Sequence, residues 1–207
     1  MSTQTSANSR RTTYTPDSLL AVAVAVFNER GYDGTSMEDL ARAAGITKSS
    51  IYHHVKGKEE LLTRGVNRAL DALNASLDAL DTLEPLPDPG ELDRVEQAVY
   101  RAVQILVEEL PYVTLLLRVR GNTEAERAAQ ARRREIDKRL AGFVERAAAA
   151  GTLRTDIDPY LASRLVFGMV NSVVEWYRPG HELSADDVAS AVTHLVFDGL
   201  RRRGAEG

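Results

Sequence analysis

Apolar residues recur at helical spacing along most of the chain. From Pro16 they form one stripe until Gly31, where a glycine after the last apolar position indicates a helix end. The same spacing, with glycine or proline at the boundaries, predicts four helices in the first eighty residues, at 16–30, 36–43, 47–54 and 57–80. No alternation of apolar and polar residues predicts a strand of any length, so we expect an all-α fold.

A proline-rich stretch separates these helices from the rest of the chain. Residues 81–91, DTLEPLPDPGE, contain three prolines and predict a loop between two lobes. Beyond it the periodicity predicts five more helices, which brings the total to about nine, at 91–109, 111–119, 123–150, 158–178 and 185–203. We therefore expect three parts: a disordered polar arm at 1–13, a small helical head at 14–62 and a larger helical domain at 63–207.

Composition removes several classes of function. The 207 residues include no cysteine, which excludes disulfide scaffolds, zinc–thiolate sites and thiol nucleophiles. No run of eighteen apolar residues predicts a membrane span, and the polar N-terminus does not resemble a signal peptide, so we expect a cytoplasmic protein without a membrane partner. The net charge is −4, but residues 1–70 carry nine Lys and Arg against seven Asp and Glu, a balance of +2. Such a head can still bind DNA, because phosphate contacts are local and screened over about 10 Å.

The segment GITKSSIYHHVKGKEELL, residues 45–62, concentrates the candidate chemistry. Its serines, tyrosine, histidines and lysines permit three interpretations: a metal site, a catalytic site, or a surface that binds phosphate. Two short helices about three residues apart are typical of a helix-turn-helix, here over about residues 37–56. The small Ala44-Gly45 pair in the turn is expected to allow a close helix crossing. Thr35 and Glu38 are expected to form the capping box of the first helix.

The second short helix, capped by Thr47, is predicted to be a recognition helix that lies in the major groove. Ile46 and Ile51 should pack on the preceding helix and turn the polar residues outward. Lys48 is expected to reach a base acceptor, and the hydroxyl, imidazole and ammonium groups around it to donate to phosphates. The predicted DNA-contacting residues are Thr35, Thr47, Lys48, Ser49, Ser50, Tyr52, His53, His54 and Lys58.

The other interpretations of this segment have less support. His53 and His54 are adjacent, and neighbouring residues on a helix point about 100° apart, so they do not converge on one metal ion. The serines lack the G-x-S-x-G or S-x-x-K setting of a nucleophile, which makes an enzyme the least favoured class. A merely solvated polar face stays open as the simplest alternative.

Residues 31–62, which include the run TSMEDLARAAGITKSSIYHHVKGKEELL, closely resemble the N-terminal domain of TetR-type transcriptional regulators. The most recognisable feature is Tyr52-His53-His54, with Lys58 six residues after the tyrosine. The resemblance covers about residues 15–62. Two positions depart from the family pattern, where a glycine or proline and a capping serine or asparagine are common: Ser49 and Gly57.

This resemblance implies a ligand-responsive DNA-binding repressor whose second domain binds a small-molecule effector and forms a homodimer, with no cofactor and no metal. Two heads would insert recognition helices into successive major grooves of a pseudo-palindromic operator in double-stranded DNA. The sequence of the second domain is consistent with a dimer, because the helix at 160–178 is apolar around most of its circumference and should pack on two sides. The predicted dimer-interface residues are Leu161, Leu165, Val174, Val188, Val192, Leu195 and Val196.

Two stretches of the second domain, YVTLLLRVRGNTEAERAAQARRREIDKRL and VEWYRPGHELSADDVA, resemble the family members that respond to acyl-CoA thioesters. Such a ligand needs an apolar tunnel for its acyl group and cations for its phosphates. The predicted ligand-binding residues are Leu115, Arg118, Arg120, Arg127, Phe143, Phe167, Met169, Val170, Val173 and Trp176. The Arg132-Arg133-Arg134 triplet is a further candidate, although solvated ion pairs are its simpler interpretation. Two alternatives stay open: a free hydrophobic drug or lipid as effector, and a dimeric helical binding protein without DNA binding.

Overall fold

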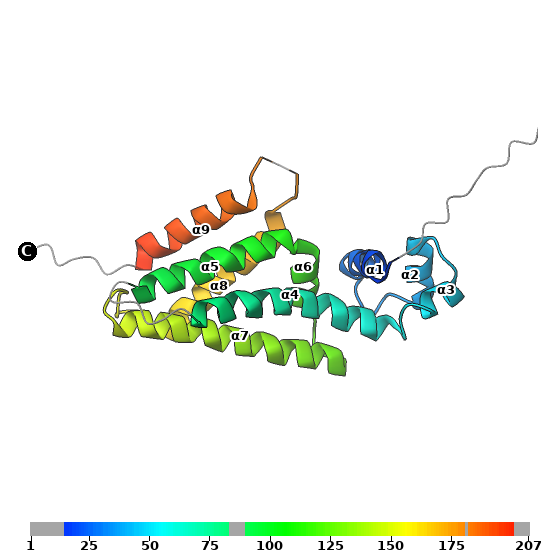
Figure 1. The fold of residues 1–207 in the computed structure, drawn as a ribbon, viewed down its shortest axis with the longest axis horizontal. Coiled ribbons are helices and arrows are strands. Elements are labelled where there is room, and N and C mark those ends of the chain that lie inside the picture. The colour runs from blue at the N-terminus through cyan, green and yellow to red at the C-terminus, as the bar shows by residue number, and fades with distance from the viewer. Residues whose placement is uncertain (1–14, 83–89, 181, 201–207) are drawn as a thin grey trace, which may run out of the picture. The chain divides into compact units, whose positions relative to one another are not determined.

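The computed structural model describes residues 15–82, 90–180 and 182–200. The regular elements of these ranges are helices, with no β-strand among them, which confirms the all-α fold class (Figure 1). The predicted N-terminal arm and most of the proline-rich loop lie outside the described residues. Within the same ranges no helix is long and apolar enough to cross a membrane. The nine helices described are α1 (Pro16–Arg30), α2 (Met37–Ala44), α3 (Lys48–Tyr52), α4 (Lys58–Asp81), α5 (Gly90–Glu108), α6 (Leu110–Arg118), α7 (Glu124–Ala149), α8 (Pro159–Trp176) and α9 (Ala185–Leu200).

Local capping contacts begin several of these helices where the sequence indicates. The Thr15 hydroxyl accepts a hydrogen bond from the Ser18 amide at 3.2 Å, and Pro16 takes the first helical position, where it loses no intrahelical bond. Before α9 the Ser184 hydroxyl accepts from the Asp187 amide at 3.1 Å, and the Asp187 carboxylate accepts from the Ser184 amide at 2.8 Å. Each cap satisfies amides that the first helical turn cannot pair internally.

The cap of α2 differs from the prediction by one residue. The side chain that caps α2 is Ser36, which accepts from the Asp39 amide, so the box of Thr35 with Glu38 is wrong. Thr35 is only 2% exposed, and its hydroxyl donates to the Gly31 carbonyl oxygen at 2.7 Å. The sequence offers two capping pairs one residue apart, Thr35 with Glu38 and Ser36 with Asp39. The burial of Thr35 decides that the Ser36 hydroxyl caps α2.

The described residues divide into two compact units, with the boundary inside α4 between Leu61 and Leu62. In the first unit α1 packs on α2, and α2 packs on α3. The apolar faces of this unit form a small core of almost completely buried side chains: Leu19, Ala23, Phe27, Leu40, Ala41, Ile51 and Leu61. Burial of each large side chain contributes about 1.5–3 kcal/mol, so this core fixes the turn between α2 and α3.

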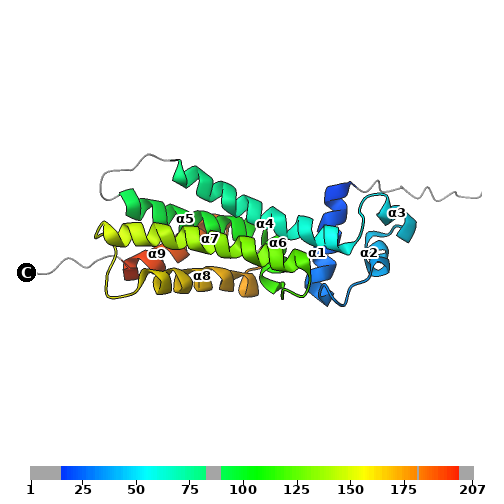
Figure 2. The same cartoon turned by 90° about the horizontal axis from the view of Figure 1, so that it is seen from below.

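In the second unit α5 packs against α6, α7, α8 and α9 (Figure 1). α7 also packs against α8, and the two helices run side by side along the unit (Figure 2). The largest buried side chains come from most of these helices: Leu70, Val99, Val103, Leu116, Phe143, Val170 and Phe197. This bundle surrounds the hollows described below.

A repeated polar contact joins α7 to α4. Arg132 Nη2 donates to Asp71 Oδ1 at 2.7 Å, and seven residues later Arg139 Nη2 donates to Asp78 Oδ1 at 2.8 Å. The same two arginines also donate to amide oxygens one turn earlier on α4, those of Asn67 and Asn74. Seven residues are close to two helical turns, which keeps both arginines on one face of α7. Arg132, the first member of the arginine triplet, is therefore occupied in holding α4.

Candidate functional site

The turn between α2 and α3 depends on one glycine. Gly45 has φ +68°, in the left-handed region, and its amide donates to the Ala41 carbonyl oxygen. A Cβ at Gly45 would meet no atom within 4 Å. Backbone conformation, rather than the expected close helix crossing, therefore requires this glycine. The Ile46 amide then donates to the Ala41 carbonyl oxygen at 3.0 Å, and the Thr47 hydroxyl caps α3 by accepting from the Ser50 amide at 3.1 Å.

α3 presents polar side chains around one anchored isoleucine. Ile51 is fully buried, whereas Tyr52 is 48% exposed. The helix ends at Tyr52, two residues before its predicted end. Of the predicted contact residues around α3, five are exposed and two half-buried: Thr47, Lys48, Ser49, Tyr52 and His53, then Ser50 and His54. This surface carries hydroxyl, imidazole and ammonium donors, the groups that phosphate oxygens and base edges accept from.

Lys48 is paired within the head. Its Nζ donates to Glu38 Oε1 at 2.7 Å, and both side chains are more than half exposed. The hydrogen bond from Lys48 lowers the pKa of Glu38, and the same bond raises the pKa of Lys48, so both groups stay ionised at neutral pH. A base contact by Lys48 must therefore compete with the Glu38 carboxylate.

Lys58 begins α4, one residue after the predicted start at Gly57, and its ammonium lies against the head itself. The Nζ donates to the carbonyl oxygens of Tyr32 and Thr35, at 3.0 Å each, and lies 4.4 Å from the centroid of the Tyr32 ring. An ammonium has three N–H donors, so at most one is left for a phosphate oxygen. A phosphate contact by Lys58 therefore stays a prediction. The predicted contact by Thr35 is wrong, because its side chain is buried and its hydroxyl is bonded to Gly31.

The second unit contains an apolar cavity with an empty volume of about 540 Å³, part of which is open to solvent. Five helices, α4 to α8, contribute apolar side chains to its wall: Leu73, Ala102, Leu106, Val113, Leu116, Leu117, Ile136, Leu140, Phe167 and Val170. Three polar residues complete the lining: Arg133, Asp137 and Asn171. All three also line a neighbouring cleft, which therefore adjoins the cavity.

This neighbouring cleft lies between α7 and α8 and has an empty volume of about 940 Å³. Arg164 Nη1 donates to the Tyr160 hydroxyl at 3.2 Å within its wall. Burial raises the pKa of Asp137, while the charges of Arg133 and Arg164 act in the opposite direction. The cations that line this cleft are Arg133, Arg134, Lys138 and Arg164. We call it the cationic cleft.

The structure brings together only part of the predicted ligand-binding set. Phe167 and Val170 line the cavity, and Phe143 lines a separate apolar hollow. Two other predicted residues are buried in the core but line neither the cavity nor the cationic cleft: Leu115 and Val173. Three predicted arginines are exposed and lie outside both: Arg118, Arg120 and Arg127. Two members of the arginine triplet, Arg133 and Arg134, line the cationic cleft instead.

Sequence reasoning missed several residues of the cationic cleft. Asp137, Lys138 and Arg164 were not selected, although they lie four residues from other polar residues that line it. A spacing of four places two side chains on one face of a helix, so polar pairs on α7 and α8 were the available signal. The pairs are 133/137, 134/138 and 160/164.

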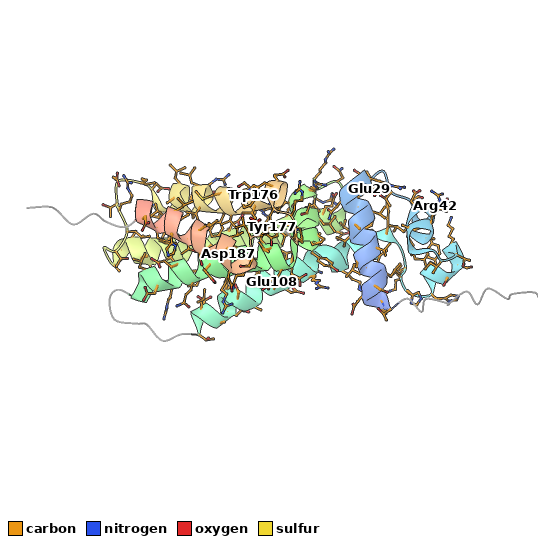
Figure 3. The ribbon with its side chains drawn as sticks, turned by 90° about the horizontal axis from the view of Figure 1, so that it is seen from above. Glu29, Arg42, Glu108, Trp176, Tyr177 and Asp187 are labelled. Atoms are coloured by element: carbon orange, nitrogen blue, oxygen red, sulfur yellow. The ribbon has the colours of Figure 1, made fainter. Side chains whose placement is uncertain are left out.

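Both α8 and α9 expose large apolar side chains. Leu195 of α9 is 72% exposed, and four residues of α8 are between 44% and 61% exposed: Leu161, Leu165, Met169 and Trp176. We call these five residues the outer face; Trp176 is labelled near the end of α8 in Figure 3. Met169 and Trp176 line neither the cavity nor the cationic cleft, and their predicted ligand contacts stay predictions. Val174 is half-buried, and the predicted interface role is wrong for three valines buried within the subunit: Val188, Val192 and Val196.

Comparison with known proteins agrees with this two-unit arrangement. Residues 19–64 match the family described as "Bacterial regulatory proteins, tetR family", and residues 88–200 match "Tetracyclin repressor-like, C-terminal domain". The chain is 32% identical over 190 residues to the HTH-type transcriptional repressor KstR2 of Rhodococcus jostii (strain RHA1), covering 88% of this chain and 89% of that protein.

Solved structures show the same fold. The crystal structure of SCO3833, a TetR-family regulator from Streptomyces coelicolor A3, is 56% identical with a TM-score of 0.79, covering 91% of this chain and 94% of that one. The structure of AibR in complex with isovaleryl coenzyme A and operator DNA is 23% identical with a TM-score of 0.73, covering 88% and 97%. With family matches over both units and a similar repressor along most of its length, this chain belongs to the TetR family of bacterial transcriptional regulators.

Proposed function

We propose that this protein is a homodimeric repressor that binds operator DNA through α3 and leaves it when an acyl-CoA thioester fills the cavity. Proteins of this family regulate transcription and are not enzymes. One observation carries the choice of effector: the apolar cavity adjoins a cleft lined by four cations. An acyl-CoA has the two matching halves, an apolar acyl group and a nucleotide with phosphates, which arginine binds well. A free hydrophobic molecule would leave the cations without a role.

Two relatives support a repressor with this class of effector. KstR2, at 32% identity, is a transcriptional repressor. AibR shares the fold of this chain, and its structure contains both isovaleryl coenzyme A and operator DNA. AibR is therefore a precedent for a CoA ester and DNA on one protein of this fold.

The outer face supports the homodimer. Exposed large apolar side chains of this kind mark interaction sites, and a two-fold dimer would cover the same side chains on both subunits. The symmetry would then present two α3 helices to successive major grooves of a pseudo-palindrome. Effector binding would favour a dimer conformation whose head separation no longer matches the groove spacing, so operator affinity would fall.

Thermal unfolding with matched ligands tests the effector. Octanoyl-CoA at about a hundredfold excess over its Kd should stabilise the protein by about 2.7 kcal/mol, and octanoic acid and coenzyme A alone by less. Arg133→Gln and Arg164→Gln should each weaken octanoyl-CoA binding by about tenfold or more, since each removes a charge-assisted hydrogen bond. Arg118→Gln, outside the cationic cleft, is the control. Equal stabilisation by acid and ester would overturn the acyl-CoA assignment.

Binding to the DNA upstream of the protein's own coding region tests the repressor half. Affinity should fall steeply as salt rises, because each phosphate contact contributes about −0.9 to the slope of log K against log salt. Saturating octanoyl-CoA should then release the DNA. The absence of binding even at low salt would leave a dimeric small-molecule-binding protein as the better description.

A further inference from the structure

Phe167 of α8 lines three hollows of the second unit. It belongs to the wall of the cavity, to that of the cationic cleft, and to that of a third hollow with an empty volume of about 310 Å³. Of the residues that line these hollows, Phe167 is common to all three. Its ring therefore lies where the three spaces meet.

The third hollow is apolar throughout. It lies between α5, α7, α8 and α9, and its wall includes Val99, Phe143, Val166 and Phe197, with no charged or amide side chain among the lining residues. The space open to a water-sized sphere within it is only about 10 Å³, so the third hollow is a narrow apolar seam beside the cavity and offers a polar group no hydrogen-bond partner.

The neighbours of Phe167 show that it separates these two spaces. Along α8, Val166 lines the third hollow and Val170 lines the cavity, whereas Phe167 lines both. From α7, Leu140 lines both spaces. Phe167 and Leu140 together form a partition, and the aromatic ring is its larger part.

We propose that Phe167 sets the size of the acyl group that this protein accepts, a proposal that rests on the acyl-CoA effector above. With the ring in place, an acyl group that enters from the cationic cleft is confined to the cavity, which favours a slender linear chain. A smaller side chain at position 167 vacates the volume of the ring and opens the cavity toward the apolar seam of the third hollow. The enlarged space then admits a wider, ring-containing acyl group.

Calorimetric titration with one slender and one wide probe tests the partition. Octanoyl-CoA and adamantane-1-carbonyl-CoA are titrated into the full-length wild type, Phe167→Ala and Phe167→Leu, together with the two corresponding free acids. The matched control is Phe197→Leu, because Phe197 is almost fully buried and lines the third hollow but not the cavity. Circular dichroism verifies that each variant is folded, and Phe167→Leu supplies the comparison if Phe167→Ala does not fold.

The wild type should bind octanoyl-CoA more tightly than the adamantane ester. Phe167→Ala should shift the ratio of the two affinities toward the adamantane ester by about tenfold or more, the scale of small fit differences in hydrophobic pockets. Phe197→Leu should leave the ratio unchanged. An unchanged ratio in a Phe167 variant that still binds octanoyl-CoA overturns the partition and leaves the proposed effector standing.

The free acids separate failure of the effector from failure of the partition. If the wild type binds neither CoA ester, the acyl-CoA proposal fails on its own. In that case, tighter binding of adamantane-1-carboxylic acid by Phe167→Ala than by the wild type still supports the partition, and equal binding overturns it.

Discussion

Replacing Lys58 by methionine separates two roles for this residue. The sequence pattern predicts a phosphate contact, whereas the structure places the ammonium on two backbone carbonyls and beside an aromatic ring. Methionine keeps an unbranched apolar stem of similar length and removes the charge and the donors. Lys58→Met should therefore destabilise the first unit even in the absence of DNA.

The size of this effect follows from the contacts that are lost. A hydrogen bond from a charged donor contributes about 1.5–3 kcal/mol, and a partly exposed cation–π contact about 0.5–1 kcal/mol. One ammonium makes all three contacts, so their contributions do not add in full. We expect a loss of about 2 kcal/mol in the free energy of unfolding of the head, a large part of the stability of so small a unit.

Hydrogen exchange of the backbone amides in residues 31–45, with DNA anisotropy at several salt concentrations, measures both roles. Lys58→Met should accelerate exchange in this segment, and Lys56→Met should not, because the exposed Lys56 makes its described bond through its backbone amide. Unchanged exchange in Lys58→Met, together with a salt slope reduced by about 0.9, would refute the reasoning and assign Lys58 to one phosphate.

Three further predictions concern the DNA surface, the dimer and the cleft. Glu38→Gln should raise the affinity for non-operator DNA in anisotropy titrations, because it frees Lys48 and removes a negative charge near α3. Lys48→Gln should lower this affinity. Equal changes in affinity in the two variants would contradict the pairing. Leu195→Glu should convert the proposed dimer to a monomer in analytical ultracentrifugation, and Ala131→Glu on exposed α7 surface should not. Octanoyl-CoA affinity should rise as pH falls through the raised pKa of Asp137, because protonation neutralises the carboxylate near the phosphates. In calorimetric titrations across pH, Asp137→Asn should bind more tightly above that pKa and lose this dependence.

Much of the fold follows from local signals in the sequence. Helix starts at Thr15-Pro16 and before α9 follow from caps within three residues, and the glycine turn after α2 follows from a backbone angle that glycine adopts at little cost. These interactions involve near neighbours in the chain, so they do not depend on how distant helices meet. The exposed polar surface around Tyr52 was predictable for the same reason, since one buried isoleucine orients a helix of five residues.

The cavity and its charges were not predictable in this way. For the phosphates the sequence offered Arg118, Arg120, Arg127 and the Arg132-Arg133-Arg134 triplet. Arg133 and Arg134 line the cationic cleft, together with Arg164, which the sequence did not select. Their proximity depends on the packing of α7 against α8, which joins residues about thirty positions apart. A helical pattern shows that a residue lies on a given face, but it does not show which other helix that face meets.

The sequence by itself determined that this protein is all-helical, with a capped helix-turn-helix in its first sixty residues, because those features arise from contacts along the chain. Only the tertiary structure decided that Ser36 rather than Thr35 caps α2, and that Lys58 holds backbone carbonyls. It also decided that Val192 faces the core while Leu195 faces outward. In each case two chemically similar choices differ in burial, and burial is set by segments that are distant in sequence and close in space.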